Sequence, residues 1–131
     1  DPRLVGAFGV FEMQSNVFDH CVAFSGKGAP QLQACDGSAG QTLTLTDLGD
    51  YLMEVRDLES AQCLASNAAT VLHAQCDASS VQVWRMAVQS WQPLLVKWVA
   101  ANDQCLAGVE GLRLTLADCA DAAAEWRLVK R

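Results

Sequence analysis

Residues 63–84 read CLASNAATVLHAQCDASSVQVW, and this stretch decides the fold because its outline occurs three times along the chain. The outline consists of a cysteine, a short turn, a second cysteine, a polar loop and a large apolar residue at the end. The other two copies span residues 21–43 and 105–126. The leading cysteines stand at positions 21, 63 and 105, so consecutive copies are 42 residues apart. A repeat of this length predicts that three similar units build one fold.

All 6 cysteines fall at the two cysteine positions of these copies. Spacing by itself leaves several pairings open. The simplest pairing that respects the repeat joins the two cysteines of each copy, which predicts the disulfides Cys21–Cys35, Cys63–Cys76 and Cys105–Cys119. Persistent disulfides indicate an oxidising compartment, so we expect an extracellular or secreted protein. A metal site is disfavoured because the chain has no C-x-x-C pair and its histidines, His20 and His73, lie in different copies.

The length of 131 residues predicts a single domain, which we place at residues 7–131 after a lead segment at 1–6. Within it we expect repeats at about 7–48, 49–91 and 92–131. A hydrophobic content of 51% with 18% charged residues is typical of a globular chain. The net charge of −6 disfavours nucleic acids and anionic lipid surfaces as partners. No apolar run is long enough to span a membrane, so membrane insertion is not expected.

Alternation of polar and apolar residues, as in 42–46, predicts short half-buried strands and almost no helix. Residues 120–125 have helical propensity, but we expect only a loop or a short 3₁₀ turn there. The expected strands are 10–14, 21–24, 31–35 and 42–46, then 51–56, 63–66, 71–76 and 81–86, and finally 94–99, 105–109, 112–117 and 125–129. Four strands are too few to bury a core alone, so the three units should close around a common axis. Leu43, Trp84 and Trp126 recur at the end of each copy, and we expect them to point into this shared core.

The threefold repeat with two cysteines and a Gln-x-Trp per unit resembles the ricin B-type β-trefoil over nearly the whole chain. The motif is complete only at Gln82 and Trp84, since the first copy ends in leucine and the third has lost the glutamine. The resemblance implies an all-β, β-trefoil fold of three four-stranded repeats. It also implies an extracellular sugar-binding or docking module, often part of a toxin or an appendage of a larger secreted enzyme.

The same resemblance places a sugar-binding aspartate two residues after each leading cysteine, but here these residues are Ala23, Ala65 and Ala107. Alanine has no acceptor for a sugar hydroxyl. Only the first repeat keeps hydrogen-bonding side chains on the opposite pocket wall, so a residual carbohydrate site is expected at Gln31, Gln33 and Gln41. The alternative is that Gln31 and Gln33 are solvated strand residues and that Gln41 braces the backbone. His73 offers either a polar contact in the second repeat or an exposed strand position.

Nothing in the sequence favours an enzyme or a cofactor. The G-x-S-x-G motif is absent, and the expected disulfides leave no cysteine free as a nucleophile. A cluster of carboxylates follows the first repeat, and we interpret it as a solvated acidic patch instead of a glycosidase pair. Its members are Asp47, Asp50, Glu54, Asp57 and Glu59.

Three functions remain open: a protein-docking module, a carbohydrate-binding module with one residual site in the first repeat, and an enzyme or protease inhibitor. The docking hypothesis rests on Trp91, which precedes Gln92 and Pro93 and is expected to lie outside the repeated strands. Such a tryptophan either folds back over the end of the barrel or stays exposed as an anchor for a partner. We expect a protein partner or a cell-surface glycan, within a larger complex or chain such as a toxin.

Overall fold

The structure is a computed structural model, and it describes residues 7–24, 29–68, 70–77, 79–109 and 113–131. Twelve strands form within these ranges, which confirms the all-β prediction. The strands are β1 (Ala7–Ser15), β2 (Cys21–Ala23), β3 (Gln31–Gln33), β4 (Leu43–Asp47), β5 (Leu52–Asp57), β6 (Gln62–Asn67), β7 (Thr70–Gln75), β8 (Trp84–Trp91), β9 (Leu94–Val99), β10 (Cys105–Val109), β11 (Arg113–Ala117) and β12 (Trp126–Lys130). Short 3₁₀ turns precede the last strand of each unit, at η2 (Ala39–Gln41), η3 (Ser80–Gln82) and η4 (Ala122–Ala124).

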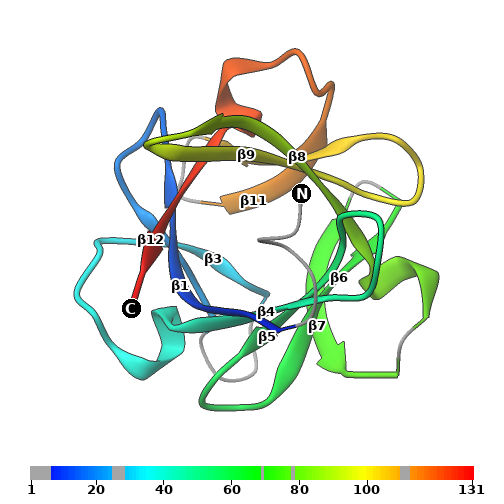
Figure 1. Ribbon diagram of the computed structural model, residues 1–131, viewed down its shortest axis with the longest axis horizontal. Coiled ribbons are helices and arrows are strands. Elements are labelled where there is room, and N and C mark those ends of the chain that lie inside the picture. Colours follow the sequence, from blue (N-terminus) through cyan, green and yellow to red (C-terminus); the bar gives the residue numbers. More distant parts are fainter. Residues whose placement is uncertain (1–6, 25–28, 69, 78, 110–112) are drawn as a thin grey trace.

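Six of the strands pair in a closed ring, in the order β1, β4, β5, β8, β9, β12 and back to β1. The remaining strands form the hairpins β2–β3, β6–β7 and β10–β11. The blue-to-cyan, green and yellow-to-red parts of the chain therefore form three lobes around a common centre (Figure 1). Strand β11 also contacts both other hairpins, through Arg113 opposite Gln31 and Thr115 opposite Thr70. Closure matters because it pairs the edges that an open sheet of this length would expose.

The residues that end each copy meet in the core, as expected. Leu43, Trp84 and Trp126 are all fully buried. The indole Nε1 of Trp84 donates to the carbonyl oxygen of Leu64 at 2.9 Å, and Trp126 donates in the same way to Leu106 at 2.9 Å. Burial of an indole is favourable when its N–H finds an acceptor, so the two rings stabilise the barrel without a desolvation penalty.

The threefold repeat extends to the backbone at the entrance of each hairpin. The residue two positions before the leading cysteine has a positive φ in every unit, with 56° at Asp19, 59° at Ala61 and 66° at Asp103. A left-handed conformation is unfavourable for residues with a Cβ atom, and it persists only where the surrounding structure enforces it. The sharp turn into the hairpin is therefore a property of the fold that is independent of the residue type.

The largest difference from the expected strands lies in the second unit. Residues 80–82 form η3, and β8 begins at Trp84 and continues to Trp91, beyond the expected 81–86. Trp91 is thus paired with Leu94 inside a β-hairpin, and the expectation that it lies outside the strands was wrong. Most other strands differ only at their ends. The expected lead at 1–6 and the start of the expected strand at 112 lie outside the described residues.

No helix among the described residues is both long and apolar enough to cross a membrane.

Candidate functional site

The cysteines pair within each unit, as the repeat predicted. The bonds Cys21–Cys35, Cys63–Cys76 and Cys105–Cys119 have sulfur–sulfur distances of 2.04, 2.02 and 2.01 Å. Carboxylates lie close to two of them, Glu12 beside the first and Glu54 beside the second. A sulfur in a disulfide supplies no thiolate, so these groupings lack the donors that a thiolate metal site needs.

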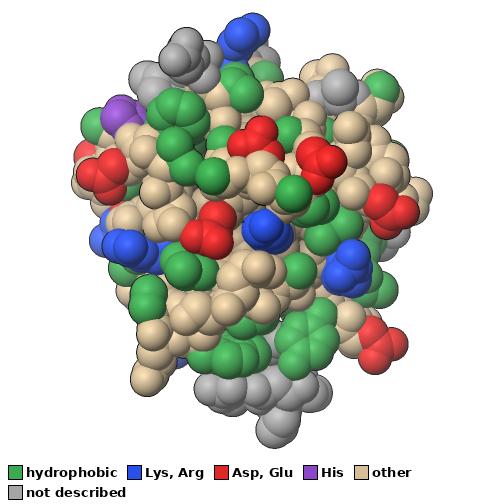
Figure 2. Space-filling view, turned by 90° about the horizontal axis from the view of Figure 1, so that it is seen from above, with side chains coloured by type: hydrophobic (Ala, Val, Ile, Leu, Met, Phe, Trp, Pro, Cys, Tyr) green, Lys and Arg blue, Asp and Glu red, His purple; other side chains and the backbone are tan. Residues whose placement is uncertain are grey.

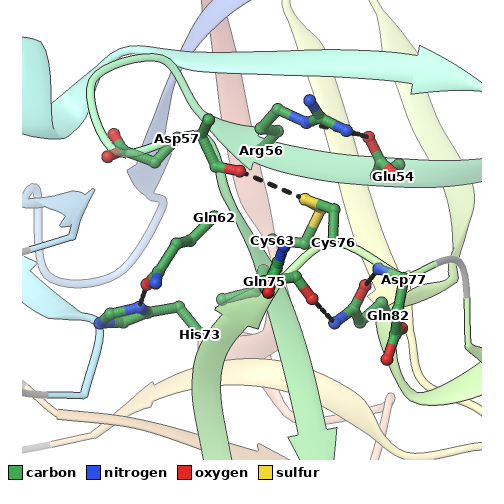
Figure 3. Close-up of a disulfide and its surroundings, with 12 residues drawn as sticks. Glu54, Arg56, Asp57, Gln62, Cys63, His73, Gln75, Cys76, Asp77 and Gln82 are labelled. Carbon is green, nitrogen blue, oxygen red and sulfur yellow. Dashed lines mark hydrogen bonds and ion pairs between the residues drawn. A yellow bond between two sulfur atoms is a disulfide. The ribbon is translucent and has the colours of Figure 1, made fainter.

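The glutamine of the Gln-x-Trp motif braces the loop that holds the second cysteine (Figure 3). In the second unit, Gln82 Nε2 donates to the carbonyl oxygen of Gln75 at 2.8 Å, and the backbone N–H of Asp77 donates to Gln82 Oε1 at 2.9 Å. These two backbone groups flank Cys76. The side chain is buried, with 3% of its surface exposed. The glutamine therefore satisfies a backbone carbonyl and a backbone N–H on either side of Cys76.

Gln41 does the same in the first unit. Its Nε2 donates to the carbonyl oxygen of Ala34 at 2.8 Å, and its Oε1 accepts from the backbone N–H of Asp36 at 3.0 Å. With only 1% of its surface exposed, the amide faces the backbone and not the solvent. This is the bracing arrangement that the sequence left open. The third unit has the buried Ala124 at this position, and there Asp121 accepts from the N–H of Ala123 instead.

The three positions that hold the sugar-binding aspartate in the resembled family are closed in this structure. Ala23, Ala65 and Ala107 are exposed by only 2%, 2% and 1%. Each lies in the first strand of a hairpin, opposite a residue of the second strand. These positions offer neither an acceptor nor an accessible surface to a sugar hydroxyl.

Gln31 lines a hollow between the three repeats, but the structure does not assemble the expected glutamines there. Gln31 is exposed on β3 and lines a hollow of about 340 Å³ together with Pro30, Thr70 and Arg113. Gln33 is half-buried two residues further along β3. Gln41 is committed to the cysteine loop, so the side chains that share the hollow with Gln31 include Thr70 of the second unit and Arg113 of the third, and neither of the other two glutamines.

His73 is half-buried and joins two repeats, so it does not take the exposed strand position that the sequence left open. Its ring lies 5.3 Å from the ring of Phe24, centroid to centroid, and its Nδ1 is hydrogen-bonded to Gln62 Oε1 (Figure 3). It occupies the position of Leu32 and Leu116 in the other hairpins, three residues before the second cysteine. Alignment of the three copies would have shown that this position faces inward.

The acidic cluster after the first repeat is not a uniformly solvated patch. Asp57 is 1% exposed, and its Oδ2 accepts from the backbone N–H of Ser60 at 2.8 Å and from its hydroxyl at 2.7 Å. Glu54 forms an ion pair with Arg56 at 3.0 Å. Asp57 thus holds the turn between β5 and β6, where the sequence suggested a solvated carboxylate.

Three adjoining hollows on the side of β5, β8 and β9 share one residue, Arg85, and we call this surface the Arg85 face. The first has a volume of about 360 Å³ and is lined by Asp50, Tyr51, Arg85, Met86, Val88 and Trp91. The second, of about 330 Å³, is lined by Leu52, Ser80, Val83, Arg85, Val99, Ala100, Ala101 and Asp103. The third, of about 430 Å³, is lined by Arg85, Ala87, Gln89, Lys97, Val99, Asp103, Cys105 and Cys119.

Trp91 combines the two positions that the sequence left open for it. The ring is half-buried and packs against the edge of the core, yet it lines the first hollow of the Arg85 face. Sequence reasoning missed Arg85 and Tyr51. The alternation along β8 places Arg85 outward, next to the buried Trp84, but nothing local predicts that Tyr51 comes to lie beside it.

One side of the molecule, seen from above Figure 1, mixes all types of side chain (Figure 2). Acidic and basic side chains are interspersed with hydrophobic ones there, and no large patch of one kind forms.

No protein-family model matches this chain, and no curated protein matches it. Solved structures do match. SeviL bound to asialo-GM1 saccharide has a TM-score of 0.78 at 12% identity, with 93% of this chain and 97% of that chain covered. The BEL beta-trefoil has a TM-score of 0.78 at 12% identity, covering 97% and 96%. A mosquitocidal holotoxin has a TM-score of 0.80 at 13% identity, but the match spans 94% of this chain and 17% of the toxin chain. These similarities, together with the six-stranded barrel and its three hairpins, show that the chain has the β-trefoil fold.

Proposed function

We propose that this chain is a non-catalytic β-trefoil module that docks on a protein partner through the Arg85 face, within a secreted or surface assembly. The observation that carries the proposal is the contrast between the two kinds of surface. The three former sugar positions are buried alanines, whereas the Arg85 face presents an aromatic ring, a cation and hollows of several hundred Å³.

The chemistry of Trp91 supports a protein contact. Tryptophan and arginine are the residue types most enriched among the side chains that dominate binding at protein interfaces. Here both line the same hollow, and Tyr51 lies beside them. A half-buried Trp91 is held by the core, so little side-chain entropy is lost when a partner covers the rest of the ring.

The assembly part of the proposal draws on the solved structures. One match is a segment of a much longer holotoxin chain, which shows that a trefoil of this size occurs as one part of a toxin. The three disulfides suit the same extracellular setting.

The test is a pull-down of the native complex with the full chain as bait. Trp91→Ala should weaken association at least about tenfold, as expected for a residue that dominates an interface. Gln31→Ala is the matched control, because it alters an exposed side chain of the candidate carbohydrate site and should leave association unchanged. Equal recovery of the complex by the wild type and Trp91→Ala would reject this docking surface.

A carbohydrate-binding module is the second candidate, and the hollow at Gln31 favours it. An exposed amide, the side chain of Arg113 and the ring of Pro30 line one shallow surface there. A glycan array with the isolated chain tests this function. Binding of a simple sugar that Gln31→Ala abolishes and Trp91→Ala preserves would establish the carbohydrate-binding module in place of the docking module.

A further inference from the structure

Arg85 is the cation that all three hollows of the Arg85 face share. It is exposed on β8, and no described residue forms a hydrogen bond or an ion pair with its guanidinium. Among the described arginines, Arg56 pairs with Glu54 and Arg131 with Glu12, whereas Arg113 and Arg127 resemble Arg85 in forming no such contact with a described residue. The chain has more carboxylates than cations, with a net charge of −6, and yet no described carboxylate pairs with Arg85. The fork of five donors on Arg85 is therefore open to a planar acceptor such as a carboxylate.

The surroundings of Arg85 set the shape of what can bind there. On one side, the first hollow is lined by Tyr51, Trp91 and Val88, which form an apolar wall beside the cation. On the other side, Lys97 lines the third hollow, and its Nζ donates to the carbonyl oxygen of Cys119 at 2.6 Å. A ligand with one carboxylate and an adjoining apolar group uses both Arg85 and the wall.

Two carboxylates limit the number of negative charges that the face accepts. Asp50 lines the first hollow and Asp103 lines the second and third, and neither is within ion-pair distance of Arg85. A second acidic group on the ligand would approach one of them and be repelled. The face is thus suited to a single carboxylate and disfavours a run of acidic residues.

The backbone of β8 adds a reason to expect an extended ligand. Strand β8 pairs with β5 only at Trp84 and Arg85, and the N–H of Met86 donates to the carbonyl oxygen of Tyr51 at 2.8 Å. Among the described residues no strand continues this edge from Ala87 to Ser90, although the other edge is paired with β9 from Arg85 to Trp91 apart from an irregularity at Gln89. Backbone groups at an unpaired edge can accept an additional strand from a partner.

We infer that the Arg85 face binds an extended peptide segment of the partner that carries one Asp or Glu next to an apolar residue. The carboxylate receives hydrogen bonds from Arg85, the apolar side chain packs against Trp91 and Tyr51, and the backbone adds to the open edge of β8. This inference rests on the proposed docking function and names the chemistry of the partner.

The experiment is a selection of random linear peptides displayed on phage against the immobilised full chain. Peptides enriched on the wild type should carry a single Asp or Glu beside an aliphatic or aromatic residue. Synthetic versions should lose about tenfold in affinity when that acid is changed to its amide, and about as much when the chain carries Arg85→Gln. The same peptides should bind Arg127→Gln like the wild type, since Arg127 is also exposed but lines none of the three hollows. An unchanged melting temperature of Arg85→Gln confirms that the variant folds.

Several outcomes would overturn the inference. One is a selection without enrichment of acidic residues, and another is equal affinity for the acid and amide peptides. If Arg127→Gln loses as much affinity as Arg85→Gln, the effect is bulk charge and not a site. If glucuronate binds in an Arg85-dependent manner while glucose and the peptides do not, the ligand is a sugar acid. A pull-down that depends on Trp91 together with any of these results would leave the docking function standing and reject only the acidic segment.

Discussion

At the scale of single residues, the three equivalent core positions are occupied by two types of side chain, tryptophan in two units and leucine in one. Trp84 and Trp126 each bury a large ring and place the indole N–H on a carbonyl oxygen of the hairpin in the same unit. Leu43 fills the corresponding position with a smaller side chain and no donor. In the second and third units this hydrogen bond links the barrel to the hairpin, and the first unit lacks it.

Replacement of Trp84 by alanine should cost about 3–5 kcal/mol of unfolding free energy, as large-to-small changes in a core do. The variant also leaves the carbonyl oxygen of Leu64 without its donor. Trp84→Phe keeps most of the buried surface and should cost less, roughly 1–3 kcal/mol for the lost hydrogen bond and the remaining cavity. Urea denaturation measures both. A Trp84→Ala variant within about 0.5 kcal/mol of the wild type, the usual range of surface changes, would contradict the placement of this ring in the core.

At the scale of elements, the loops after the second cysteines are built by the same two side chains in the first and second units. A glutamine bridges the backbone across the cysteine, and an aspartate accepts from the N–H two residues later. The pKa of Asp36 lies below its ordinary value of 3.8, mainly because the backbone N–H of Ser38 donates to the carboxylate, and secondly because the side chain of Ser38 does so. The backbone and then the side chain of Ser79 lower the pKa of Asp77 in the same way.

These lowered pKa values predict a small acid-dependent loss of stability. A carboxylate with a lower pKa in the folded state stabilises the fold above its unfolded pKa, and this contribution disappears as the pH falls through the folded pKa. The melting temperature of the wild type should therefore fall below about pH 4 more steeply than that of the double variant Asp36→Asn/Asp77→Asn. Asparagine keeps an acceptor for the loop but does not titrate.

Asp50→Asn is the control for this measurement, because it removes an exposed carboxylate that does not hold either loop. Asp36 and Asp77 are both exposed, so solvent screens their interactions and only a modest difference in melting temperature is expected. Parallel pH profiles for the wild type and the double variant would show that the loop aspartates do not contribute to acid sensitivity.

At the scale of the whole molecule, stability comes from pairing between units. Strand β4 of the first unit pairs with β5 of the second over five residue pairs, and β8 of the second pairs with β9 of the third over most of its length. The buried side chains of all three units belong to one main cluster. A single unit thus contains strands whose partners and core neighbours belong to other units.

An isolated second unit, residues 49–91 with Cys63–Cys76 formed, should not fold as a monomer. One disulfide contributes roughly 3 kcal/mol, which does not replace the core and the barrel pairing that the other units supply. Circular dichroism should show no cooperative melting, and the amide proton spectrum should be poorly dispersed. A cooperative transition at a concentration where sedimentation shows a monomer would contradict the dependence of each unit on its neighbours.

The sequence by itself determined the three units and the inward direction of Trp84 and Trp126, and it made pairing within each unit the simplest of the possible disulfide arrangements. These features follow from period and alternation, which each copy repeats independently. The tertiary structure decided which side chains from separate strands and units come into contact. Closure of the barrel places Tyr51 beside Arg85 and Trp91, although they lie on different strands or turns of the second unit.

Closure likewise brings Phe24 of the first unit onto His73 of the second. Burial of Gln41 has the same origin, since only the folded loop shows that its amide satisfies two backbone groups. Local pattern specifies which face of a strand is apolar. It does not specify which polar side chains from separate strands share a hollow, because that depends on the packing of the closed barrel.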